Sequence, residues 1–315
     1  MLCFDKLMLR TRAAYVSEID GEAFDVISKG GEVLYLRYKQ KKPYELLIKV
    51  DQQNDEMILE FTGKILLDNY TALINSGTFL ACLKQINRMG ICRLNEVAIY
   101  VDSEVLKCDV TRDVRLPDMK GLVGTVRQSL SNYSKWSADG YRGGVVLEKV
   151  VSTERFKKRL TFYDKGKELA KKRNKEFLSR VLNPDRMTRY FADKVRFELN
   201  ITTKEGIRKM LDVPDTDLRT VLNSTANPIL SVFDEAVKCD APTAPTAVRT
   251  VRDAERLAFL ETCDCDMAKL EAKIRGLSSG NVIRAMRPYR DLMARLRASA
   301  ETEGVTLQDV RDLLQ

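Results

Sequence analysis

The sequence predicts an α+β protein: an antiparallel β-sheet with flanking helices, followed by a small all-helical C-terminal domain. Two observations predict this class. Short segments with the two-residue alternation or the Leu, Val and Tyr enrichment of strands dominate the chain up to Ile201. The three-to-four-residue spacing of helices dominates from Thr203 onward. Runs of strands followed by runs of helices are typical of α+β proteins.

The N-terminal third is expected to supply four strands and a helix. Glu32–Tyr38 and Tyr44–Val50 are rich in Leu, Val and Tyr and suggest a hairpin across the basic connection Lys39–Pro43. Gly77–Met89 has apolar residues at helical spacing, and Gly90 is a suitable residue to end that helix. The other two strands are expected at Leu2–Arg10 and Met57–Phe61.

The middle of the chain is expected to supply the strands that carry the chemistry. Lys194–Ile201 alternates apolar and polar side chains without a break, which is typical of a half-buried strand. The basic segment Lys165–Val181 is expected to be helical. The remaining expectations are a strand at Val105–Leu116, a helix at Leu122–Leu130, and two antiparallel strands at Gly143–Val151 and Phe156–Tyr163.

One segment is typical of a linker. Cys239–Thr246 combines two prolines with small residues. The sequence therefore predicts a sheet-containing domain at residues 1–238, a linker at 239–246 and a helical C-terminal domain at 247–315. The last helix is expected at Leu307–Leu314, with Thr306 as its N-cap.

The composition excludes several classes of enzyme. The 315 residues contain no histidine, which rules out Ser-His-Asp and Cys-His hydrolases and His-ligated metal centres. The seven cysteines are scattered without a Cys-x-x-Cys pair, so they are interpreted as reduced thiols. No signal peptide and no stretch long enough to span a membrane are recognised. We therefore expect a cytoplasmic protein with no membrane partner.

The positive charge is concentrated in one segment. The formal net charge is +8, and Thr153–Arg208 alone contains 17 basic and 8 acidic residues. Such a segment is either a solvated helix face or a surface for the phosphates of a nucleic acid. On the second interpretation we expect DNA contacts from Lys171, Lys172 and Lys175 and, on nearby strands, from Arg159 and Arg196.

Reactive side chains recur at every second position of three expected strands. If these strands are neighbours, one face of the sheet holds carboxylates that suit Mg²⁺ or Mn²⁺, together with a tyrosine that could attack a phosphate. The alternative is that the carboxylates only pair with neighbouring Lys and Arg. The three sets are Asp109, Thr111 and Asp113; Arg159, Thr161, Tyr163 and Lys165; and Arg196, Glu198 and Asn200.

Three of these segments resemble motifs of rolling-circle replication initiators. Arg159-Leu-Thr-Phe-Tyr-Asp-Lys-Gly-Lys-Glu168 resembles the tyrosine motif of plasmid initiators of the Rep-trans type and of filamentous-phage gene II/X replication proteins. Val195-Arg-Phe-Glu-Leu199 is similar to their downstream acidic strand, and Cys108-Asp-Val-Thr-Arg-Asp113 to their upstream one. The start, Asp5–Arg10, also resembles that of the phage group.

The resemblance implies a mechanism and a set of site residues. It implies that Tyr163 nicks DNA, forms a 5′-phosphotyrosyl bond and leaves a free 3′-OH, with Lys165 as a second catalytic residue. It also implies that Asp109 and Glu198, with Asp113 as a further candidate ligand, hold Mg²⁺ or Mn²⁺. Tyr190 is a second candidate nucleophile, although packing or DNA binding is the preferred interpretation.

The predicted function is thus sequence-specific DNA nicking and strand transfer that starts rolling-circle replication of a plasmid or phage-like element. Two alternatives stay open: a mobilisation relaxase with the same chemistry, and a non-catalytic DNA-binding protein. The expected partner is origin DNA, supercoiled or single-stranded. A second copy of the chain, as a homodimer, and a host helicase are further candidates.

Overall fold

The computed structural model describes residues 2–116, 129–132, 134–141, 143–150, 156–238, 248–277, 280–300 and 307–315, together with Leu122 and Val126. The predicted linker at 239–246, Thr306 and most of the helix expected at Leu122–Leu130 lie outside these residues. None of the described helices is long and apolar enough to cross a membrane.

A ten-stranded sheet forms the centre of the molecule, and every neighbouring pair of its strands is antiparallel. Its strand order is β3-β4-β5-β6-β1-β8-β12-β11-β10-β9, and β2 and β7 form a separate two-stranded sheet. The strands are β1 (Phe4–Thr11), β2 (Val16–Ser17), β3 (Asp25–Lys29), β4 (Glu32–Gln40), β5 (Leu46–Asp51), β6 (Glu56–Thr62), β7 (Arg93–Leu94), β8 (Glu104–Arg115), β9 (Trp136–Tyr141), β10 (Gly144–Lys149), β11 (Arg159–Asp164) and β12 (Lys194–Ile201).

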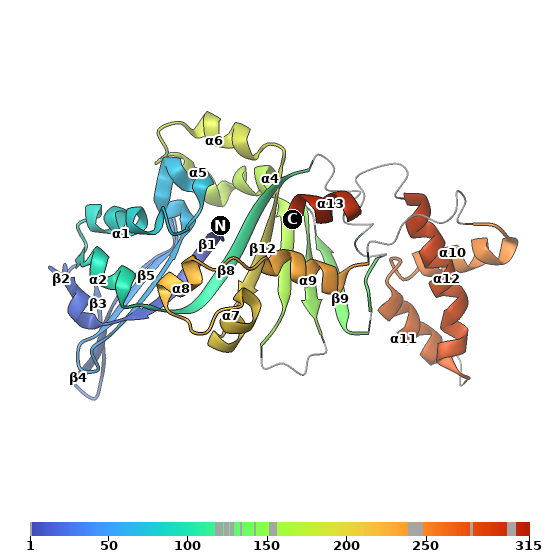
Figure 1. Ribbon diagram of the computed structural model, residues 1–315, viewed down its shortest axis with the longest axis horizontal. Helices are drawn as coiled ribbons and strands as arrows, with labels where there is room; N and C mark the ends of the chain where they lie inside the picture. The colour runs from blue at the N-terminus through green and yellow to red at the C-terminus, as the bar shows by residue number, and fades with distance from the viewer. Residues whose placement is uncertain are drawn as a thin grey trace.

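Helices cover both faces of this sheet, and three of them gather beyond the edge formed by β9 (Figure 1). The α-helices are α1 (Phe79–Arg88), α2 (Glu96–Val101), α4 (Lys165–Leu169), α5 (Lys175–Leu178), α6 (Pro184–Phe191), α7 (Lys204–Leu211), α8 (Leu218–Leu222), α9 (Pro228–Ala236), α10 (Val251–Glu261), α11 (Met267–Leu277), α12 (Val282–Ala300) and α13 (Leu307–Leu314). The 3₁₀ helices are η1 (Ala13–Tyr15), η2 (Gly63–Ala72) and η3 (Lys172–Asn174).

The two faces of β12 show how its alternating sequence divides the molecule. Phe197 stacks on Phe162 of β11 and meets Phe233 of α9, so this apolar face belongs to the main core under α7, α8, α9 and α13. Arg196 and Glu198 point to the opposite, polar face. A smaller apolar cluster from η2, α4, α5 and α6 covers part of that polar face. The α+β prediction is therefore confirmed.

The basic segment Lys165–Val181 is helical, as the sequence predicts, but its helix is interrupted. It consists of α4, η3 and α5 in succession. The chain turns into α4 directly after β11, because the Asp164 side chain caps the helix by accepting a hydrogen bond from the Lys167 backbone N–H at 2.8 Å. Gly166 allows α4 to lie against α6, since a Cβ there would be 2.8 Å from the Phe191 carbonyl oxygen. These turns carry the segment back over the polar face.

The last helix does not pack with the other C-terminal helices. α10, α11 and α12 share a core of their own around Leu260, Leu270 and Leu292. Leu307 and Val310 of α13 instead belong to the core of the sheet. The sequence assigns residues 247–315 to one helical domain, whereas α13 packs on the sheet and belongs to the same core as the sheet.

Candidate active site

The three strands that carry the reactive residues are neighbours, as the predicted site requires. β8, β12 and β11 lie side by side, and the register places their polar side chains in three rows across one face. The rows are Asp109, Asn200 and Arg159; Thr111, Glu198 and Thr161; and Asp113, Arg196 and Tyr163.

Tyr163 lies diagonally across from Glu198, and the two side chains are in contact. The Tyr163 hydroxyl donates a hydrogen bond of 2.6 Å to Glu198 Oε1. Burial raises the pKa of Tyr163 strongly, and the charge of Glu198 raises it further. The site by itself therefore does not favour the phenolate, which is the opposite of what a ready nucleophile needs.

Glu198 has the properties of a proton acceptor for this phenol. Burial, together with the negative charge of Asp5, raises the pKa of Glu198 to about 7. A carboxylate with a pKa near neutrality, at hydrogen-bond distance from a hydroxyl, meets both requirements for a general base. The arrangement can remove the proton of Tyr163 while the oxygen attacks.

Arg196 does not have the exposure that the predicted DNA contact requires. Its side chain is 0% exposed, and its Nε and Nη2 donate to the two oxygens of Asp113 at 2.7 and 2.8 Å. Its Nη1 donates to Asp5 Oδ1 at 2.7 Å and to the Tyr70 hydroxyl at 2.6 Å. The prediction that Arg196 binds DNA is corrected: the small apolar cluster covers this part of the polar face, so the guanidinium lies inside the protein.

The same geometry corrects the assignment of Asp113 as a ligand of one metal ion with Asp109. Both Asp113 oxygens are occupied by the fork of Arg196. Asp109 lies four residues away on the same strand, which is about 13 Å along an extended chain. Two aspartates at that separation do not reach one metal ion.

Lys165 is close to Tyr163 but is not on its strand. It is the first residue of α4, its side chain is 2% exposed, and its Nζ lies 2.8 Å from Glu168 Oε2. The Nζ is 5.5 Å from the centre of the Tyr163 ring. Lys165 therefore places a positive charge beside the site from within the protein, and its side chain is too buried to contact DNA.

Asp5 is a residue of the site that lies outside the tyrosine motif and the two acidic strands. It lies on β1, where the pairing with β8 shifts register between Phe4 and Lys6. Burial by itself would raise the pKa of Asp5, but Arg196, Lys165 and Lys64 together hold it below its usual value. The sequence signal was an acidic residue inside an apolar strand-like run, at a start that resembles the phage group.

The carboxylates of three adjacent strands have the chemistry of a hard-cation site. Asp109 accepts a hydrogen bond from Asn200 Nδ2. Burial raises the pKa of Asp109 to about 6, with a further contribution from Asp5. Oxygen donors of this kind suit Mg²⁺ or Mn²⁺. In the described part of the chain, however, no three Asp, Glu or Cys side chains converge closely enough to hold a metal ion.

A cavity of about 360 Å³ opens onto Tyr163 and Glu198. Its wall includes Tyr141 of β9 and three basic side chains of the segment after β11: Lys167, Lys171 and Arg173. Among the other predicted DNA contacts, Arg159, Lys172 and Lys175 are exposed. Exposure agrees with the prediction that these residues meet phosphates but does not test it.

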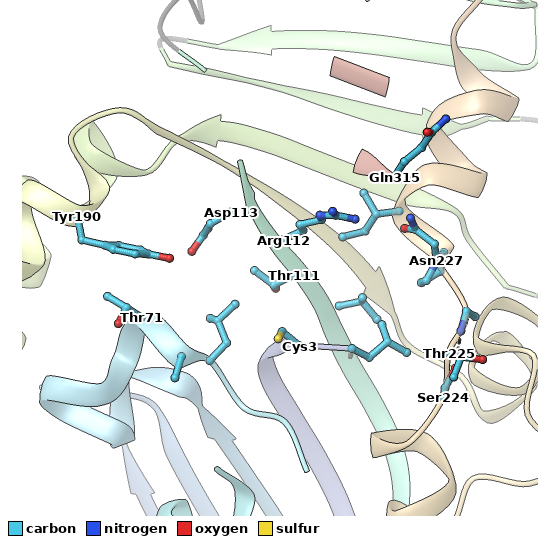
Figure 2. Close-up of a pocket in the computed structure, with 17 residues that line it drawn as sticks. Cys3, Thr71, Thr111, Arg112, Asp113, Tyr190, Ser224, Thr225, Asn227 and Gln315 are labelled. Carbon is cyan, nitrogen blue, oxygen red and sulfur yellow. Dashed lines mark hydrogen bonds between the residues drawn. The ribbon is translucent and has the colours of Figure 1, made fainter. Parts of the chain in front are cut away.

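A second cavity, of about 460 Å³, lies beside this site (Figure 2). The Tyr190 hydroxyl and the Asp113 carboxylate point toward one another across it. On its far side, Arg112 Nη1 and Asn227 Nδ2 each donate a 2.6 Å hydrogen bond to the Leu314 carbonyl oxygen. Tyr190 thus lines a different cavity from Tyr163, and its role as a second nucleophile stays a prediction.

The comparisons with known proteins agree with the motifs. No curated protein and no solved structure matches the chain. Residues 77–219 match a family model for the N-terminal region of the replication-associated protein of filamentous-phage gene II. The matched segment includes β8, β11 and β12 and covers somewhat less than half of the chain. The match confirms the resemblance to rolling-circle replication initiators for the segment that carries the tyrosine and both acidic strands.

Proposed function

We propose that the protein starts rolling-circle replication by cutting one DNA strand with Tyr163 and holding the cut end as a 5′-phosphotyrosyl ester. The observation that carries this proposal is the 2.6 Å hydrogen bond from the Tyr163 hydroxyl to Glu198, at a cavity lined by basic side chains. A nucleophile paired with a base is the arrangement that covalent catalysis uses.

The proposed step conserves atoms and charge. The Tyr163 oxygen forms a bond to phosphorus, and the phenol proton passes to Glu198. The bond between phosphorus and the 3′ oxygen breaks, and that oxygen takes a proton from water to become a free 3′-OH that can prime synthesis. Glu198 then returns its proton to the solvent, so no net proton is gained or lost. The reverse reaction rejoins the strand, because a phenol is a good leaving group when it leaves as the phenolate.

We further propose that Asp109 and Glu198 hold Mg²⁺ or Mn²⁺ during the reaction. Such an ion would supply positive charge to the phosphate oxygens. Glu198 has two carboxylate oxygens, and Oε1 is the one that faces Tyr163. The raised pKa values of Asp109 and Glu198 support the proposal: burial is the main cause of each, the negative charge of Asp5 adds to both, and a bound cation would offset these effects.

The test is incubation with supercoiled DNA of the protein's own replicon plus Mn²⁺, followed by a search for a covalent protein–DNA adduct. We expect an adduct and a nick with wild type, and neither after Tyr163→Phe. Tyr141→Phe is the matched control, because Tyr141 lines the same cavity. It should still form the adduct. Chelation with EDTA and the Asp109→Asn variant should both suppress nicking.

Other results would contradict the proposal in distinct ways. An adduct from Tyr163→Phe would place the nucleophile elsewhere. Nicking without an adduct by wild type would make water the nucleophile, and full activity in EDTA would remove the metal from the mechanism. DNA binding with no cutting would favour the non-catalytic alternative. Loss of replicon transfer with replication intact, in cells that carry Tyr163→Phe, would favour a mobilisation relaxase.

A further inference from the structure

Arg173 is an exposed cation in the wall of the Tyr163 cavity, outside the motifs that point to the site. It lies in η3, between α4 and α5. Its side chain is 65% exposed, and its Nη2 lies 2.8 Å from Glu168 Oε1. Among the described residues no other hydrogen bond or ion pair engages this guanidinium. Its remaining N–H groups can therefore bind a ligand in the cavity.

The position of Arg173 is fixed by a buried polar network. Glu168 is held at 2.8 Å by Lys165 and at 3.1 Å by Asn174 Nδ2. Asn174 is only 2% exposed, and its Oδ1 accepts a 2.8 Å hydrogen bond from Lys64 Nζ. Asn174 directly follows Arg173, so the network that buries one residue also positions the next. Arg173 is thus pre-organised in a way that a free surface lysine is not.

Tyr141, which also lines the cavity, is closely packed against β10. Gly144 of β10 pairs with both Tyr141 and Tyr163 across the sheet. A Cβ on Gly144 would lie 2.5 Å from the Tyr141 hydroxyl, so only glycine allows this close approach. The hydrogen bond to Glu168 is the main cause of the raised pKa of Arg173, and the nearby phenols of Tyr163 and Tyr141 contribute to it. Arg173 and Tyr163 line the same cavity, so a phosphate bound there can meet both side chains.

We propose that Arg173 binds the scissile phosphate while Tyr163 attacks it, an inference that rests on the proposed nicking function. The other cations near the nucleophile suit this role less well. Lys165 is buried, and Lys167 is paired with Asp164 at 2.6 Å. Lys171 also lines the cavity, but its ammonium is a single point charge on a flexible stem. The planar guanidinium matches two phosphate oxygens at once, which a lysine does not.

The role is electrostatic and transfers no proton. As the Tyr163 oxygen approaches phosphorus, negative charge increases on the two non-bridging oxygens. A fixed guanidinium stabilises that charge more than it stabilises the ground-state phosphate. Arg173 would consequently affect the rate of cleavage more than the affinity for DNA.

The experiment uses an oligonucleotide that spans the nick site mapped in the adduct assay, and measures single-turnover adduct formation and DNA affinity separately. Arg173→Gln should slow cleavage by about 10²–10³-fold, as the loss of one such donor does in other enzymes, with affinity within a few fold of wild type. Arg173→Lys should recover only part of the rate. Arg180→Gln is the matched control, because Arg180 is an exposed arginine of the same basic segment and does not line the cavity. It should cleave within about threefold of wild type, because removing it leaves that donor in place.

A substrate with a methylphosphonate at the scissile position supplies a readout that a merely structural role would not change. This group replaces one charged non-bridging oxygen by a neutral methyl group. Cleavage by wild type should therefore become slower, whereas the cleavage rate of Arg173→Gln should fall little further. The ratio of the wild-type rate to the Arg173→Gln rate should approach one. A ratio unchanged from that with normal DNA would overturn the proposal, as would equal losses in Arg173→Gln and Arg180→Gln. If wild type forms no adduct on normal DNA, the proposed function itself fails. If Arg173→Gln cleaves at the wild-type rate, only the role of Arg173 fails.

Discussion

Two charge clusters lie side by side on the polar face of the sheet, and they differ in how completely their charges are paired. Around Arg196, all three guanidinium nitrogens donate hydrogen bonds, to the carboxylates of Asp5 and Asp113 and to the Tyr70 hydroxyl. Around Glu198, the ion pair found among the described residues is with Arg196 Nη1 at 4.0 Å, and the close partner is the neutral hydroxyl of Tyr163.

The difference separates a structural centre from a reactive one. A buried ion cluster with every group satisfied holds strands together and has no remaining capacity for a ligand. A buried carboxylate without a close cation has a perturbed pKa, and such groups mark functional sites. Sequence alternation places both clusters on the same face and gives no means of telling them apart.

The largest effect is expected for the incompletely paired cluster. Glu198→Gln keeps the size of the side chain but removes the base, so nicking should fall by about 10²–10⁴-fold. Thermal stability should stay near that of wild type, because no ion pair closer than 4.0 Å is lost. Glu176→Gln, an exposed change in the basic segment, is the control and should leave nicking intact. A large loss of stability in Glu198→Gln would remove the distinction between the two clusters.

The paired cluster should respond in the opposite way. Arg196→Met leaves Asp5 and Asp113 as buried charges without their cation, and breaking a buried ion pair costs about 3–5 kcal/mol. Denaturant unfolding should record that loss in the free energy of unfolding. Arg196→Lys, which keeps the charge but not the fork, should be intermediate. Normal stability together with weaker DNA binding would instead restore Arg196 as a DNA contact.

The smallest effect should come from the exposed basic segment, which belongs to neither cluster. Replacing Lys171, Lys172 and Lys175 together by Gln should weaken binding to origin and random DNA alike, since phosphate contacts carry no sequence information. If all three lysines meet phosphates, the slope of log affinity against log salt should become shallower by about 2.7. An unchanged slope would show that these lysines are only a solvated surface.

Period-two patterning predicted the sheet face well. The strand expected at Lys194–Ile201 has those bounds, and β8 and β11 are its neighbours on either side. The pattern could place Asp109, Glu198 and Tyr163 on one face because alternation is a local property of the chain. The order of strands in the sheet depends on distant segments, so the sequence could not predict it. That the three strands are neighbours was an assumption, and the structure confirms it.

Other features of the site depend on contacts between distant segments, which spacing does not encode. Arg196 was assigned to solvent because its neighbours on β12 alternate, yet the cluster that buries it comes from residues 70–191. Lys165 continues the alternation of β11 in sequence, but the Asp164 cap turns the chain into α4 before it. Asp5 lies far from the tyrosine motif in sequence, and strand pairing with β8 brings it in.

The return of α13 to the sheet changes how the C-terminal third should be divided. Val237, at the end of α9, and Leu307, at the start of α13, both belong to the core of the sheet. Arg311 of α13 is also paired with Asp234 of α9 at 2.8 Å. Residues 248–300 are therefore an insertion between two elements of one domain rather than a terminal appendage. A truncation after residue 246 would also remove α13 and expose the apolar surfaces of α9 and β8 that α13 covers. An internal deletion that removes α10–α12 and retains α13 would avoid this.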